Sequence, residues 1–215
     1  MSDNVKFALY LAVALVPSLV LHERAHAWWA GRLGDLTPKA FGRATLNPRA
    51  HVDPFGSIVL PLFLLVLWAS GRLLPPVFAY AKAMPLNPQN MKDPARGPLQ
   101  VALAGMAVNL ALAVLAALAV RAFGLSEAGL VAVAFLHVNV VMFVFQLMPV
   151  PGLDGSVILS RFLRGRAREV YGNLDQYLPL FMLVIFFLLS APLLTIVNAL
   201  GNSLCGILVG FDCLS

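Results

Sequence analysis

The chain has 215 residues, of which 60% are apolar and only 12% charged, and its mean hydropathy is +0.85. Soluble domains are about 45–50% apolar and about 25% charged, so this composition argues against a soluble enzyme, a nucleic-acid-binding module, a disulfide scaffold and a disordered tail. A helix needs about 20 largely apolar residues to cross a bilayer, and the composition therefore predicts an all-α polytopic membrane protein. The chain carries a net charge of +5, and its basic residues lie in short loops between apolar runs. This placement favours anionic lipid headgroups over nucleic acid as the partner of the basic residues.

Stretches without charged residues predict about five transmembrane helices within a single membrane-embedded domain, 1–215. The predicted spans are 5–31, 54–74, 97–121, 128–148 (continuing, broken, to about 164) and 176–200. The last charge-free run extends to residue 211 and contains Pro179, Pro192 and Gly201, so a division into two short spans, giving six in total, is the alternative. Lys6 before an apolar core has the form of a signal peptide, but no small-residue cleavage site follows it, and we expect no cleavage.

Two connecting segments, 35–53 and 75–96, are rich in proline, asparagine and small residues, and each contains an Asn-Pro pair that marks a turn. We expect short irregular or β-hairpin segments here, with Ala40–Leu46 as one candidate strand. Irregular backbone near a membrane is tolerated where it is buried in protein or lines a water-filled cavity. The two segments are therefore predicted to lie near an active site.

The loop cations predict the orientation. If the five spans alternate, nine lysines and arginines fall on the side of the N-terminus and five on the other side: Lys6, Arg72, Lys82, Lys92, Arg96, Arg161, Arg164, Arg166 and Arg168 against Arg32, Lys39, Arg43, Arg49 and Arg121. Cytoplasmic loops carry the excess of positive charge. The chain is thus expected to be a multi-pass protein of the cell (inner or plasma) membrane with a cytoplasmic N-terminus.

An HExxH motif, His22-Glu23-Arg24-Ala25-His26, lies inside the first apolar helix. Helical positions i and i+4 share a face about 6 Å apart along the axis, so both imidazoles can reach one metal ion. Glu23 lies next to that face and can take a proton from a metal-activated water and return it to a leaving amine. A chance match is the alternative, but ionisable side chains in a span are costly and point to function.

Asp154 is the best candidate for a third metal ligand. It follows an apolar span in the sequence Pro149-Val150-Pro151-Gly152-Leu153-Asp154-Gly155, where unwound backbone can direct a carboxylate into a cavity. The local pattern also fits an N-cap of a following helix, 156–164. Both interpretations stay open on the residues alone.

Gln146, Asn109 and His51 are candidates for contacts with the substrate or a developing oxyanion. Gln146 lies close to the predicted helix break, so its amide can donate a hydrogen bond there, although an interhelical hydrogen bond fits equally well. Asn109 belongs to a small-residue stripe that mainly favours close helix packing. His51 lies in an Asn-Pro loop, where a structural role has about equal support. The stripe consists of Ala102, Gly105, Asn109 and Ala113.

From about Leu21 to Ile158 the sequence resembles the site-2 protease family of intramembrane zinc metalloproteases, in particular its compact bacterial branch without a PDZ domain. The resemblance implies one zinc ion held by His22, His26 and Asp154, with Glu23 as general base. It also implies hydrolysis of peptide bonds in or near the transmembrane segments of membrane-anchored protein substrates. The matching blocks are 22–26, 47–56, 87–90, 104–109 and 149–155.

Three positions depart from the family pattern. Met106 and Gly152 stand where the family usually has proline, and Gln146 stands where it has asparagine. The ligands and the base are intact, so an active enzyme is the favoured interpretation. The alternatives are a pseudoprotease that binds membrane segments without cutting them and a metal-ion transporter.

The depth of the two metal-binding segments raises a question of topology. Simple alternation of spans places the HExxH motif toward the non-cytoplasmic side and Asp154 toward the cytoplasmic side, yet both must reach one metal. A broken helix over 128–164, with Asp154 at mid-depth, is the preferred solution. A re-entrant segment at 54–71 is the other.

Overall fold

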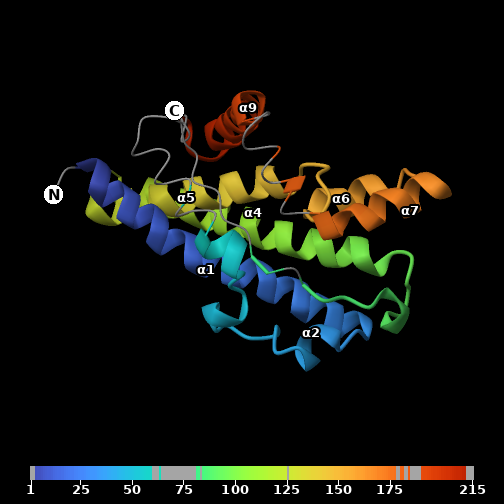
Figure 1. Cartoon of the computed structure of the whole chain (residues 1–215). Helices are drawn as coiled ribbons and strands as arrows, with labels where there is room; N and C mark the ends of the chain where they lie inside the picture. Colours follow the sequence, from blue (N-terminus) through green and yellow to red (C-terminus); the bar gives the residue numbers. More distant parts are fainter. Residues whose placement is uncertain are drawn as a thin grey trace.

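Three long helices run side by side in the computed structural model (Figure 1): α1 (Asp3–Leu33), α4 (Gly97–Phe123) and α5 (Glu127–Gln146). A fourth, α9 (Ser190–Val209), packs against α5 and α4. The structure describes residues 3–59, 63, 81–82, 84–124, 126–177, 180–181, 184 and 190–211. Within this part of the chain the regular structure is helical, in agreement with the all-α prediction.

Small residues let the long helices approach closely. Ala113, Ala116 and Ala117 of α4 are buried in one cluster with Leu136 and Val140 of α5 and Cys205 of α9. A second cluster joins Ala14 of α1 to Ala134 and Val138 of α5. Because lipid offers no hydrophobic driving force between helices, close packing of small side chains is the usual source of association in membranes. The bundle therefore has the packing expected of membrane helices.

Apolar side chains also cover the outside of α4. Leu115 is 61% exposed and Leu118 is 57% exposed. By length and composition, α4 and α5 are the helices among the described residues that are long and apolar enough to cross a membrane. The predicted spans 97–121 and 128–148 lie on these two helices. Most of the predicted span 54–74 and part of the predicted span 176–200 lie outside the described residues.

The described parts of the connection between α1 and α4 contain short helical turns. They are α2 (Thr37–Ala40), the 3₁₀ turn η1 (Pro48–Ala50) and the π-helical turn η2 (Pro54–Val59), and the second Asn-Pro pair starts the 3₁₀ turn η3 (Pro88–Asn90). The predicted strand Ala40–Leu46 is wrong, because Ala40 ends α2 and residues 41–46 form turns and bends. Pro38 favours a helix start, and Gly42 has a φ of 69° that breaks an extended run. β-structure in the described segments is limited to one antiparallel bridge, Val52 to Ala81.

Two buried charges hold the Asn-Pro segments together. The Arg43 guanidinium donates hydrogen bonds to the backbone carbonyls of Ala50 and Lys82. The Asp35 carboxylate accepts hydrogen bonds from the backbone N–H groups of Thr37, at 3.0 Å, and Asn87, at 2.8 Å. Both side chains are almost fully buried. The segments are thereby fixed to each other and to the C-terminal end of α1.

Helix α5 ends in a sharp break. Pro149 and Pro151 provide no N–H group for a continuing helix, and Gly152 adopts a φ of 90°. A new helix, α6 (Asp154–Ser160), begins after the break, and α7 (Arg166–Asn173) with the 3₁₀ turn η4 (Leu174–Tyr177) follows. The break places the start of α6 beside the middle of α1.

Candidate metal centre

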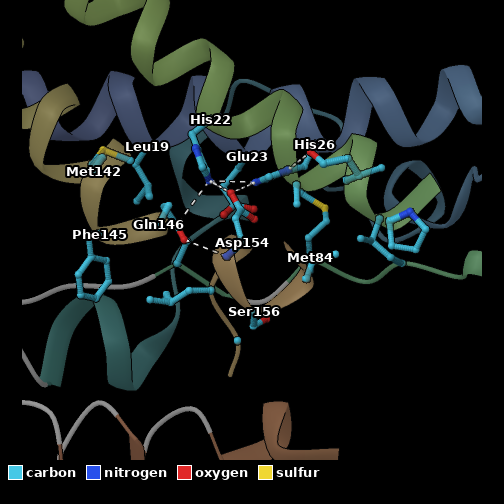
Figure 2. Close-up of a pocket in the computed structure, with 18 of the residues that line it drawn as sticks. Leu19, His22, Glu23, His26, Met84, Met142, Phe145, Gln146, Asp154 and Ser156 are labelled. Atoms are coloured by element: carbon cyan, nitrogen blue, oxygen red, sulfur yellow. Dashed lines mark hydrogen bonds and ion pairs between the residues drawn. The ribbon is translucent and has the colours of Figure 1, made fainter. Parts of the chain in front are cut away.

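Three side chains from two distant parts of the chain converge inside the bundle (Figure 2). The Nε2 atoms of His22 and His26 lie 2.9 Å apart. Each lies 3.4 Å from Oδ2 of Asp154. All the ligand atoms of this group lie within 4.8 Å of one another. The arrangement brings together the three residues that the sequence predicted as metal ligands.

Local structure explains this convergence. His22 and His26 are one turn apart on α1, so their rings extend from the same face. Asp154 is the first residue of α6, while Leu153 occupies the N-cap position. The N-cap interpretation of Asp154 is therefore wrong, because its carboxylate is directed at the two histidines.

The donor set fits zinc. Zinc binds imidazole nitrogen at about 2.0–2.1 Å and carboxylate oxygen at about 2.0–2.2 Å, usually in a tetrahedron, so its ligand atoms lie about 3.3 Å apart. The observed separations of 3.4, 3.4 and 2.9 Å are close to this value. Oδ2 of Asp154 is buried and has no hydrogen-bond partner among the described residues. Two neutral imidazoles and one carboxylate thus leave a fourth position for water, as in catalytic zinc sites.

Glu23 lies at the same site. It is 8% exposed, and its Oε2 has no hydrogen-bond partner within the described part of the chain. It lines a cavity of about 290 Å³ together with the three candidate ligands. A buried, unpaired carboxylate oxygen beside a metal site is suited to proton transfer.

Apolar side chains form most of the remaining cavity wall. They come from α1, α4, α5, α6 and the residues before η3, as Figure 2 shows for Leu19, Met142, Phe145 and Met84. An apolar wall with a few converging polar groups is typical of ligand-binding cavities.

The far sides of both imidazoles contact α4. Nδ1 of His26 lies 2.8 Å from the carbonyl oxygen of Val101, and Nδ1 of His22 lies 3.1 Å from Nδ2 of Asn109. Gly105 lies between these two contacts. A Cβ atom at Gly105 would lie 2.4 Å from Nε2 of His26 and 2.7 Å from Cε1 of His22. The two imidazoles therefore occupy the space that a side chain at position 105 would fill.

The predicted substrate residues lie in different places. Gln146 lines the cavity, with Nε2 3.4 Å from Nε2 of His22, and its Oε1 accepts a hydrogen bond from the backbone N–H of Asp154. Asn109 lies behind His22, as described above. His51 is buried in the Asn-Pro segments, where Nε2 lies 3.0 Å from the carbonyl oxygen of Thr45. Burial lowers the pKa of His51, so its ring is neutral near pH 7 and donates to that carbonyl.

The role of Gly105 in the site could not be predicted from the small-residue stripe, which indicates helix packing. Gly105 and Asn109 lie one helical turn apart on the face that meets the HExxH helix. The turn spacing was visible in the sequence, but the partner of that face was not.

The helical fold, the HExxH helix and the third ligand from a separate helix define a zinc metalloprotease. The chain is 32% identical over 187 residues to "Putative zinc metalloprotease YwhC" of Bacillus subtilis, covering 82% of this chain and 80% of the relative. It is 36% identical over 185 residues to "Putative zinc metalloprotease Rip2" of Mycobacterium tuberculosis, covering 84% and 67%. The chain belongs to the site-2 protease family of zinc metalloproteases.

No family model and no solved structure matches the chain. Membership of the family makes the chain a membrane protein and a zinc metalloendopeptidase, with zinc as its cofactor and proteins as its substrates.

Proposed function

We propose that the chain is an intramembrane protease that hydrolyses peptide bonds in or near the transmembrane segments of membrane-anchored proteins. The convergence of His22, His26 and Asp154 inside a bundle of apolar helices carries this proposal. In a soluble protease such a site opens to water, whereas here it lies between helices whose outer faces are apolar.

The proposed topology is a single domain, 1–215, with five or six spans and a cytoplasmic N-terminus. The break after α5 supports a broken fourth span, because it allows Asp154 to reach the middle of α1 without a re-entrant segment. Labelling of single cysteines placed at residues 4 and 126 in intact cells tests the orientation.

Each of the four central residues has a proposed role. His22, His26 and Asp154 hold the metal. Zinc bound there supplies Lewis acidity, which makes a water molecule a stronger acid and nucleophile near neutral pH. Glu23 accepts a proton from that water and passes it to the leaving amide nitrogen.

Gln146 is the proposed hydrogen-bond donor to the substrate. Its amide lies at the edge of the metal centre and lines the cavity, within reach of a peptide carbonyl placed there. A donor aimed at an oxygen that gains negative charge lowers the barrier of acyl transfer.

The substrate must lose its helical structure locally before it is cut. In a transmembrane helix each carbonyl oxygen accepts a hydrogen bond within the helix, and carbonyl carbons are shielded by side chains. The apolar cavity wall can accept side chains of the unwound segment, which offsets part of the energy needed to unwind it.

Glu23→Gln tests the proposal. The variant is expected to bind zinc as the wild type does and to cleave fluorophore-labelled single-span peptides in liposomes at least about 100-fold more slowly, because it lacks the proton acceptor. Glu169→Gln, an exposed glutamate on α7, is the control and should cleave normally. Wild-type protein that binds zinc but cuts no peptide in the panel would favour the pseudoprotease, and zinc flux into the liposomes would favour the transporter.

A further inference from the structure

Two buried asparagines flank the HExxH helix, one from α4 and one from α5. Asn109 contacts Nδ1 of His22 at 3.1 Å. Asn139 instead donates hydrogen bonds to Oγ of Ser18 and to the carbonyl oxygen of Phe135, both at 2.9 Å. Both asparagines are 0% exposed. They have the same chemistry and burial, but only Asn109 contacts a candidate ligand.

The orientation of the two rings determines what each Nδ1 needs. Nε2 of both His22 and His26 is directed at Asp154, so Nε2 is the metal-binding atom. A neutral imidazole that binds a metal through Nε2 carries its proton on Nδ1, which then donates a hydrogen bond. For His26 the acceptor is the carbonyl oxygen of Val101.

The backbone carbonyl of Gly105 also lies within hydrogen-bonding reach of the His22 ring, and Asn109 is the side chain in contact with its Nδ1. The oxygen Oδ1 of Asn109 is buried with no hydrogen-bond partner among the described residues, so an Nδ1–H group on His22 would satisfy it. The two ends of an amide group have nearly the same shape, so a half-turn about the Cβ–Cγ bond exchanges them within the same space. That turn brings Oδ1 to the Nδ1–H group of His22.

We propose that Asn109 is a positioning residue for the metal centre, whose amide oxygen accepts a hydrogen bond from Nδ1–H of His22 and holds Nε2 toward the zinc. Val101 and Asn109, two turns apart on α4, then orient the two ligand histidines from the same helix face. This gives Asn109 a role on the far side of the imidazole from the substrate.

Zinc affinity of purified protein, measured by competition with a chelating dye, tests this role without any substrate. Asn109→Leu keeps the approximate size but has no acceptor, and we expect its zinc dissociation constant to rise about 10–100-fold, as for other partners of ligand histidines. Asn109→Asp keeps an acceptor oxygen at the same place and removes the N–H donors. It should bind zinc within about threefold of the wild type or more tightly.

Asn139→Leu is the matched control, since it removes a buried asparagine that bonds to α1 without touching a ligand. It should leave zinc affinity unchanged even if it lowers the unfolding temperature. The proposal is overturned if Asn109→Leu binds zinc like the wild type, or if Asn109→Asp binds it tenfold more weakly. The second result would mean that an acceptor oxygen at this position does not serve His22, and it decides the question even if Asn109→Leu does not fold.

This inference rests on the proposed zinc ligands, and the two can fail separately. If the wild-type protein has no zinc affinity, both the zinc ligands and the role of Asn109 are contradicted. If the wild type binds zinc, His22→Ala loses it and Asn109→Leu leaves the affinity unchanged, only the role of Asn109 is contradicted.

Discussion

Replacing Gly105 by alanine places one carbon atom inside the metal centre. The new Cβ would lie 2.4 Å from Cε1 and Nε2 of His26, whereas ordinary contacts begin at 3.4 Å, so the ring must move by about 1 Å. Ligand atoms in metal sites must keep their positions to about 0.2 Å. Overpacking of this kind costs about 1–3 kcal/mol. At about 1.4 kcal/mol per factor of ten, we expect zinc affinity to fall by about 10–100-fold.

The same substitution should leave the fold intact. The atoms in the way belong to the ends of the imidazole side chains, which can rotate, and alanine is a better helix former than glycine by about 1 kcal/mol. We therefore expect Gly105→Ala to unfold at nearly the wild-type temperature when zinc is removed, while chelator competition shows weakened binding. Gly31→Ala, where no heavy atom lies within 4 Å of the new Cβ, is the control. Wild-type zinc affinity in Gly105→Ala would refute the close contact between α4 and the ligand histidines.

Two further predictions concern the segments that position the site. Gly155→Ala should lower both zinc content and unfolding temperature, because its Cβ would lie 2.3 Å from the carbonyl oxygens of Leu147 and Met148, which are backbone atoms that cannot rotate away; unchanged zinc content would contradict this. Asp35→Asn should destabilise the zinc-free protein by about 1–2 kcal/mol at pH 7, since it weakens hydrogen bonds to a charged acceptor. Burial raises the pKa of Asp35, but hydrogen bonds from Thr37, Asn87 and Asn90 outweigh it and hold the pKa below 3.8. The carboxylate therefore stabilises the fold above about pH 4, and this contribution is lost as the pH falls through the lowered pKa. Thermal unfolding of both proteins from pH 7 to pH 3 should show the difference shrinking, and a difference that grows on acidification would contradict the reasoning.

The parts of the site that depend on local spacing could be predicted from the sequence. The HExxH spacing alone places His22 and His26 on one helix face, and the structure confirms that their Nε2 atoms meet. The Pro-rich segment before Asp154 predicts a helix break, which lies between Gln146 and Asp154. Whether the carboxylate reaches the histidines is a question of packing, and the residues alone left it open between a ligand and an N-cap.

The parts that depend on distant partners could not be predicted. Asp35 and Arg43 belong to the first connecting segment, 35–53, and nothing in the sequence indicates that they are buried. Both are buried because their partners, Asn87 and Lys82, come from the other Asn-Pro segment. The expected strand at Ala40–Leu46 fails for a local reason. Pro38 starts a helical turn and Gly42 adopts a left-handed conformation, and these preferences outweigh the extended pattern.

The metal content of detergent-purified protein tests the three-ligand zinc site without any substrate. We predict one zinc ion per chain in the wild type and in His137→Ala, a histidine outside the metal centre. Zinc should be lost or sharply reduced in both His22→Ala and Asp154→Ala. Zinc retained by Asp154→Ala would contradict the three-ligand site, and a well-folded wild type without zinc, even after zinc is added, would contradict the assignment of the metal centre itself.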